Sequence, residues 1–80
     1  MDVVTRTIAT TVDARGQSCP GPLVTLHKAM RDANTGDLFE LLATDPGSKS
    51  DVPSWSKLSG NALVDSSEDE GVFRFVIRKA

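Results

Sequence analysis

The chain has 80 residues, of which 39% are hydrophobic and 25% charged, with a formal net charge of −2 at pH 7. This composition is typical of one small globular domain over residues 1–80, and it excludes a disordered chain. The slightly acidic balance gives no reason to expect a nucleic acid or an anionic membrane as a partner. The chain also lacks a long apolar segment, a signal-peptide pattern and a second cysteine for a disulfide, so we expect a cytoplasmic protein.

The first half of the chain predicts a strand, a helix and a second strand. Residues 8–14 are rich in β-formers, which indicates a strand. Residues 20–33 place apolar side chains at helical spacing, and Gly36 is available beyond them for a left-handed cap. Residues 38–44 have the composition of a buried strand. A strand, helix and strand of these lengths are most simply joined as a parallel crossover.

The second half predicts a shorter helix and a hairpin. Ser50 or Asp51 can cap a helix that ends at Gly60, with an apolar face formed by Val52, Trp55 and Leu58. We expect Trp55 in the core rather than in a ligand site.

Two more strands follow, and an acidic turn joins them. Residues 62–65 and 72–77 are the expected strands, and residues 66–71 read as a solvated turn that could also receive a basic partner. In the last strand Phe73, Phe75 and Ile77 share one face, which predicts one apolar face of the sheet and one mixed, partly wet face. The elements together predict a two-layer α/β sandwich.

The only cysteine lies where the first helix is expected to begin, in the segment Ser18-Cys19-Pro20-Gly21-Pro22. Proline is favoured in the first turn of a helix, so Cys19 is the expected N-cap, where the helix dipole lowers the pKa of a thiol. Because Pro20 and Pro22 have no N–H, we expect the N–H of Gly21 to face the sulfur. Arg15 either adds positive charge beside the thiol or is a solvated loop residue.

Several other kinds of site are excluded by the sequence. His27 would lie about 12 Å along the helix from Cys19, too far for a general base. One cysteine and one histidine cannot supply the four ligands of a zinc site, so we expect no metal. The segment Gly47-Ser48-Lys49-Ser50 lacks the glycine spacing of a phosphate-binding loop, and no cofactor is expected.

The segment from Asp13 to Pro22 resembles the Cys-Pro-x-Pro signature of the TusA/SirA-like sulfur-carrier proteins. The segment from Asp45 to Trp55 and the closing hairpin are similar to that family as well, although Gln17 stands where the family more often has an apolar residue. The resemblance implies a β-α-β-α-β-β domain, with a four-stranded mixed sheet and both helices on one face.

The resemblance also implies a function for the cysteine. Cys19 would accept sulfane sulfur as a persulfide and relay it to a partner protein, with Arg15, Gly16, Pro20, Gly21 and Pro22 as supporting residues. The donor would be a cysteine desulfurase or a rhodanese-type protein, and the chain would be a carrier rather than a turnover enzyme. Family members serve tRNA thiolation, cofactor biosynthesis or sulfur oxidation, and the residues do not choose among these pathways. Two other functions stay open: a redox sensor in which Cys19 is oxidised, and a regulatory interaction module that does not use the thiol.

Overall fold

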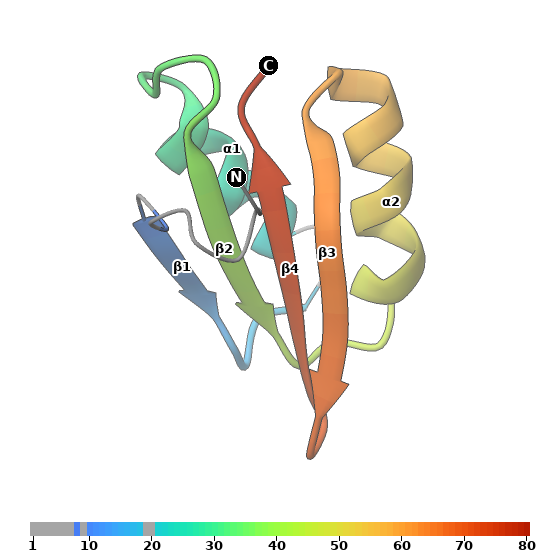
Figure 1. The fold of residues 1–80 in the computed structure, drawn as a ribbon. Coiled ribbons are helices and arrows are strands. Elements are labelled where there is room, and N and C mark those ends of the chain that lie inside the picture. The colour runs from blue at the N-terminus through green and yellow to red at the C-terminus, as the bar shows by residue number, and fades with distance from the viewer. Residues whose placement is uncertain (1–7, 9, 19–20) are drawn as a thin grey trace.

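A computed structural model describes residues 8, 10–18 and 21–80. In chain order, the elements are β1 (Thr10–Ala14), α1 (Gly21–Met30), β2 (Leu38–Ala43), α2 (Ser48–Ser59), β3 (Ala62–Asp69) and β4 (Val72–Arg78). The four strands form one sheet in the order β1-β2-β4-β3. β1 and β2 are parallel, and β4 is antiparallel to both of its neighbours. Both helices cover the same face of this sheet (Figure 1), which confirms the expected fold.

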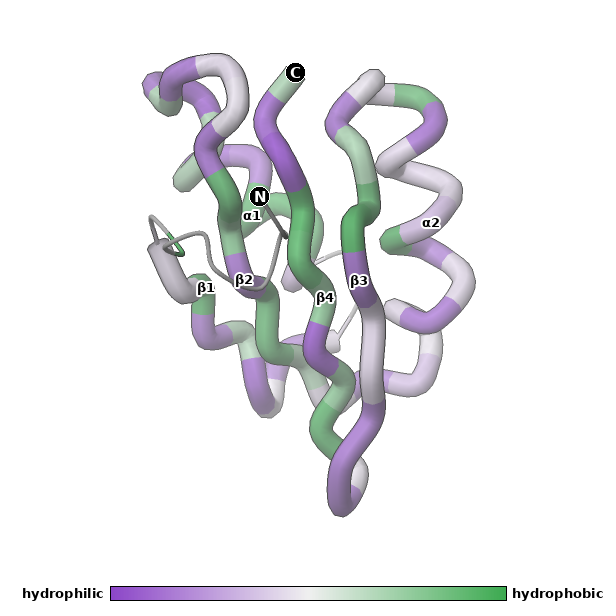
Figure 2. Tube along the Cα trace, in the orientation of Figure 1, coloured by the Kyte–Doolittle hydropathy of each residue, from purple (hydrophilic) through white to green (hydrophobic). Residues whose placement is uncertain are grey.

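The hydrophobic core lies between the helices and the covered face of the sheet. Strand pairing sets Leu41 opposite Phe75 and Phe39 opposite Ile77, and all four side chains are buried. The hydrophobic stretches of β2 and β4 run side by side at the centre of the sheet (Figure 2). The helices contribute buried side chains to the same cluster, namely Leu26, Met30 and Val52.

The first strand and the first helix are shorter than the sequence predicted. β1 begins at Thr10, so Ile8 lies outside the strand, and residue 9 lies outside the described residues. α1 ends at Met30 rather than near Ala33, because the next N–H groups make tighter, three-residue hydrogen bonds. Gly36 has a φ of +93°, as a left-handed residue should, but its N–H donates to the carbonyl of Lys79 and does not cap the helix.

The second helix begins earlier than predicted and ends where predicted. Its N-cap is Gly47 rather than Ser50 or Asp51, and Gly47 offers no side-chain cap. At the other end Gly60 has a φ of +81°, and its N–H donates to the carbonyl of Ser56.

Two apolar side chains of the second helix have different surroundings. Trp55 packs against the core while remaining partly exposed, so its predicted place in the core is largely confirmed. Leu58 is 89% exposed, and its predicted place on the buried face is wrong.

The hairpin between β3 and β4 is tighter than the predicted acidic turn. β3 continues to Asp69, so only Glu70 and Gly71 remain between the strands. Their φ values of +51° and +81° fit a two-residue turn with both central residues left-handed. The pairing shifts by one residue between Leu63 and Asp65, a bulge that keeps Asp65 on the open face of the sheet.

Candidate functional site

The predicted site lies in the connection from β1 to α1. Cys19 and Pro20 are outside the described residues, and their expected roles, including the helix cap, stay predictions. The structure does describe the other four supporting residues, which are Arg15, Gly16, Gly21 and Pro22. The end of β1, the beginnings of both helices and the β3–β4 hairpin all lie at one end of the molecule (Figure 1).

The residues that flank Cys19 and Pro20 in the chain are held to each other. The N–H of Gly21 donates to the carbonyl of Ser18 at 2.8 Å. The Gly21 N–H thus has a backbone acceptor, and its expected position facing the sulfur of Cys19, which lies outside the described residues, stays a prediction. Pro22 is almost fully buried, which fixes the first turn of α1 against the core. The cysteine thus belongs to a short segment with an anchored residue on each side.

Gln17 packs against the start of α1. Its side-chain oxygen lies 3.2 Å from the hydroxyl of Thr25, whose single proton it shares with the carbonyl of Gly21 at 3.0 Å, and its backbone N–H donates to the carbonyl of Ala14 at 3.1 Å. A β-carbon at Gly21 would lie 3.1 Å from the same Gln17 oxygen, so glycine lets the two segments approach closely. The sequence marked Gln17 only as a departure from the family pattern and missed this contact.

Arg15 is paired with Asp13. Its guanidinium donates to both carboxylate oxygens, at 2.9 and 2.8 Å, and both side chains are about half exposed. The hydrogen bonds from Arg15 lower the pKa of Asp13 to about 2. The sequence left two possibilities for Arg15, a charge beside the thiol or a solvated loop residue. Among the described residues, Arg15 is an exposed loop residue bound to Asp13.

Gly16 joins the site loop to the neighbouring strand. Its φ of +84° is a conformation that glycine adopts without strain. In this conformation its N–H donates to the hydroxyl of Thr44 at 2.9 Å. Thr44 directly follows β2, so the bond connects the β1–α1 loop with the β2–α2 loop. The sequence marked Gly16 only as a supporting residue of the family motif and gave no sign of the threonine partner.

The family is decided by comparison with known proteins. Residues 10–79 match the family model described as Sulfurtransferase TusA. The chain belongs to the TusA family. The sulfur carrier protein TusA of Pseudomonas aeruginosa is 36% identical over 76 residues, which cover 95% of this chain and 96% of that protein. Its counterpart in Pseudomonas putida is 38% identical over 68 residues, covering 85% of each chain.

A solved structure supports the same assignment. The SirA-like protein from Desulfitobacterium hafniense superposes with a TM-score of 0.75 at 25% sequence identity, covering 86% of this chain and 95% of that one. The resemblance seen in the sequence is thus confirmed at the level of family and fold, and the general role of a TusA protein is that of a sulfur carrier.

The remaining candidates do not add to the TusA site. His27 is exposed on α1 and lies six positions after Gly21, which is about 9 Å of helix. Among residues 8, 10–18 and 21–80, no group of three or more His, Cys, Asp or Glu side chains could hold a metal ion. No helix in the described part of the chain is long and apolar enough to cross a membrane.

Proposed function

We propose that this TusA-family chain carries sulfane sulfur as a persulfide on Cys19 and passes it to a partner protein. The observation that carries the proposal is that the family match over residues 10–79 includes the chain's only cysteine, two residues before the start of α1. A protein donor and a protein acceptor are the partners, and we expect the relay to operate in the cytoplasm.

The electrostatics at the start of α1 suit an anionic sulfur. The helix has ten residues, and none of the side chains in its first turn is acidic. The positive end of the helix dipole is therefore not neutralised by the helix itself. A thiolate or a persulfide anion close to this end is stabilised by the same partial charges that bind other anions at helix starts.

The chemistry needs no external oxidant. The Cys19 thiolate attacks the outer sulfur of the donor's persulfide, a new S–S bond forms on Cys19, and the donor's own S–S bond breaks to release its thiolate. Transfer to the acceptor repeats this exchange with Cys19 as the leaving thiolate. Because the chain has one cysteine, no internal thiol can attack the persulfide and discharge it.

The anchored flanks of Cys19 suit a carrier that must enter the site of another protein. The bond between Ser18 and Gly21, the buried Pro22 and the contact of Gln17 with Thr25 hold both sides of the segment. Restricting these flanks before binding lowers the ordering cost that each encounter would otherwise carry.

Intact-mass measurement after incubation with a cysteine desulfurase and cysteine tests the proposal. We expect wild type to gain one sulfur atom, reductant to remove it, and Cys19→Ala to gain none. Ser18→Ala is the matched control, because it changes the neighbouring residue and keeps the thiol, and it should gain the sulfur as wild type does.

A rhodanese-type donor provides the second arm of the same experiment. If wild type gains no sulfur from either donor, the carrier function is wrong. Oxidation of Cys19 by peroxide without any sulfur transfer would then indicate the redox-sensing alternative.

A further inference from the structure

β3 forms one edge of the sheet, and its second half is exposed. Its register with β4 is regular from Asp65 to Asp69, and a two-residue turn follows directly. In such a hairpin the residues that flank the turn share both backbone hydrogen bonds, and every second pair along the strands does the same. The backbone N–H and C=O groups of Ser66 and Glu68 therefore point to the free edge of the sheet, where the described residues form no further strand.

A hollow of about 240 Å³ lies beside this edge, on the helix side of the sheet. Phe73 and Phe75 of β4 and Pro53 of α2 provide its apolar walls, and the ammonium of Lys49 lies 5.6 Å from the centre of the Phe73 ring. Ser66 faces the same side of the sheet, because it pairs with the buried Phe75. Since the serine side chain is small, the hollow has room for an aliphatic side chain from outside.

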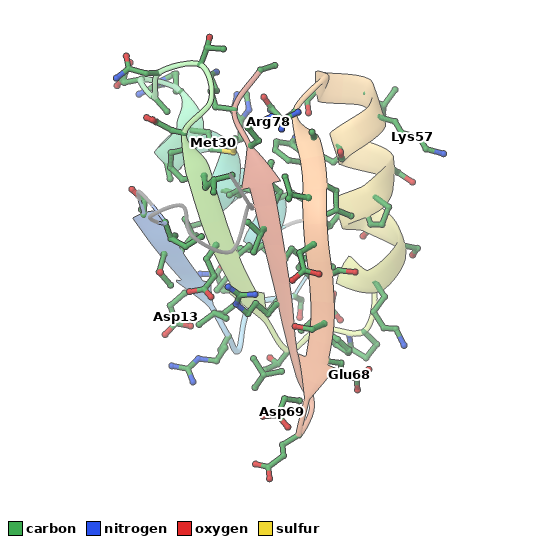
Figure 3. All side chains as sticks on the ribbon, viewed as in Figure 1. Asp13, Met30, Lys57, Glu68, Asp69 and Arg78 are labelled. Atoms are coloured by element: carbon green, nitrogen blue, oxygen red, sulfur yellow. The ribbon has the colours of Figure 1, made fainter. Side chains whose placement is uncertain are left out.

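A second hollow, of about 340 Å³, lies on the open face near the same end of β3. Leu42 and Val72 line it with apolar groups, and Asp69 and Glu70 line it with carboxylates. Asp69 lies at the hairpin end of the sheet (Figure 3). Within the described part of the chain neither carboxylate forms an ion pair, whereas Arg74, the cation of this hollow, is already paired. The charge left for a partner in this hollow is therefore negative.

We propose that the free edge of β3 binds an extended segment of a partner protein in which basic and apolar residues alternate. The segment adds a strand to the sheet through hydrogen bonds with the backbone groups of Ser66 and Glu68. Alternate side chains of a strand point to opposite faces. The apolar side chains of the segment therefore enter the hollow on the helix side, and its basic side chains face Asp69 and Glu70 on the open face.

Charge complementarity selects β3 over the other edge strand, β1. On β1 the carboxylate of Asp13 is neutralised by Arg15, whereas Asp69 and Glu70 keep their charge for an incoming strand. Opposite charges on neighbouring strands stabilise the pairing. α1 packs on β1 and β2, away from β3, so a strand added to β3 does not cover α1. The inference is thus independent of the carrier function.

Titration with a short synthetic peptide that alternates lysine and valine tests the proposal. We expect a Kd below about 1 mM, measured from the NMR shifts of the backbone amides. In the complex the N–H groups of Ser66 and Glu68 should exchange with solvent more slowly, because they become bonded to the peptide. A peptide of the same composition with its lysines and valines in two blocks should bind about fivefold more weakly, since it cannot match both faces.

Two substitutions on β3 should weaken binding of the alternating peptide. Asp69→Lys should raise the Kd about fivefold, because it replaces an attraction by a repulsion. Ser66→Leu should raise it by about the same factor, because its side chain fills the hollow on the helix side. The matched control for charge is Asp32→Lys, at an exposed position beyond the end of α1, and it should bind within about twofold of wild type. Urea unfolding of the three variants checks that each still folds.

Three results would overturn the inference. The first is no binding of the alternating peptide at about 1 mM. The second is equal weakening by Asp69→Lys and Asp32→Lys. The third is protection of the Ser66 and Glu68 N–H groups in the free protein that grows with its concentration, because a second copy would then hold the edge. Failure of the carrier function is a separate result, since it would show as wild type that gains no sulfur on Cys19 while peptide binding is unchanged.

Discussion

The two faces of the sheet are stabilised by different interactions, and β2 contributes to both. Leu41 points to the helices and is fully buried, whereas its neighbour Leu42 points to the open face and is partly exposed. In the same way, Phe39 is buried on the covered face, whereas Glu40 lies on the open face and is partly exposed. On the covered face β2 thus contributes by burial, whereas on the open face it combines the polar side chain of Glu40 with the buried Leu38.

The open face is joined by a polar network centred on Glu40. Its carboxylate accepts a hydrogen bond from the hydroxyl of Thr11 on β1 at 2.9 Å and another from the guanidinium of Arg74 on β4. Arg74 also lies 3.7 Å from Asp65 on β3, so the network reaches all four strands. The hydrogen bond from Arg74 lowers the pKa of Glu40. The comparison teaches that register, rather than composition, selects which residues of β2 belong to each face.

Of the substitutions that compare the two faces, truncation of Leu41 should lower the free energy of unfolding most. Leu41→Ala removes a fully buried side chain and leaves a cavity, which should lower the free energy of unfolding by about 3 kcal/mol. Leu42→Ala is the matched control on the same strand, and it should cost about 1 kcal/mol or less, because its side chain is partly exposed. Urea unfolding at constant m-value measures both. Equal losses would show that the two faces are equally buried in solution.

Replacing Glu40 should have a smaller effect that depends on pH. Glu40→Gln should cost about 1 kcal/mol at pH 7, since it weakens a charge-assisted hydrogen bond at a site with partial exposure. The folded pKa of Glu40 lies below its ordinary value of 4.5, so this stability is present above that value and is lost as the pH falls through the folded pKa. The wild-type advantage should therefore shrink below pH 4.5.

A double-mutant cycle identifies the partner in this effect. Urea unfolding of Glu40→Gln, Arg74→Gln and the double variant should give a coupling energy at pH 7 that disappears in acid. A difference between wild type and Glu40→Gln that stays constant with pH would contradict the role given to the Glu40 charge.

The smallest effect is expected for the exposed pair of Asp13 and Arg15. Arg15→Gln should lower the midpoint of urea unfolding at pH 7 only slightly, because both side chains are about half exposed and screened by water. The pKa of Asp13, followed by NMR of its carboxyl carbon, should rise from about 2 toward its ordinary value of 3.8. Lys57→Gln is the control, and it should leave the Asp13 titration where it is. If Asp13 of the wild type already titrates with a pKa near 3.8, Arg15 is not held by Asp13 in solution.

The sequence predicted the fold well because its strongest patterns come from burial. Phe73, Phe75 and Ile77 alternate with other residues along β4 because they face the helices, and all three are buried. Residues 66–69 were assigned to a turn because their side chains are polar, yet an edge strand tolerates polar side chains on both faces. The prediction that Leu58 is buried was wrong for the opposite reason, since an apolar residue at helical spacing need not be buried.

The candidate site was predicted in part. The sequence identified the loop and the helix start, because proline and glycine have strong local preferences that do not depend on the rest of the fold. It could not identify Thr44 as the partner of Gly16, or Thr25 as the partner of Gln17, because these hydrogen bonds depend on how the elements pack. The pairing of Arg15 with Asp13 could have been suspected, since the two residues are separated by one position.

β3 has a consequence for how the chain behaves at high concentration. It is an edge strand, and a row of free backbone groups on such a strand can pair with the edge of another molecule and begin aggregation. Asp65, Glu68 and Asp69 are exposed along β3, and the bulge after Leu63 interrupts its regular pairing pattern. An antiparallel approach of two such edges would bring carboxylates together, so the acidic side chains of β3 oppose edge-to-edge pairing.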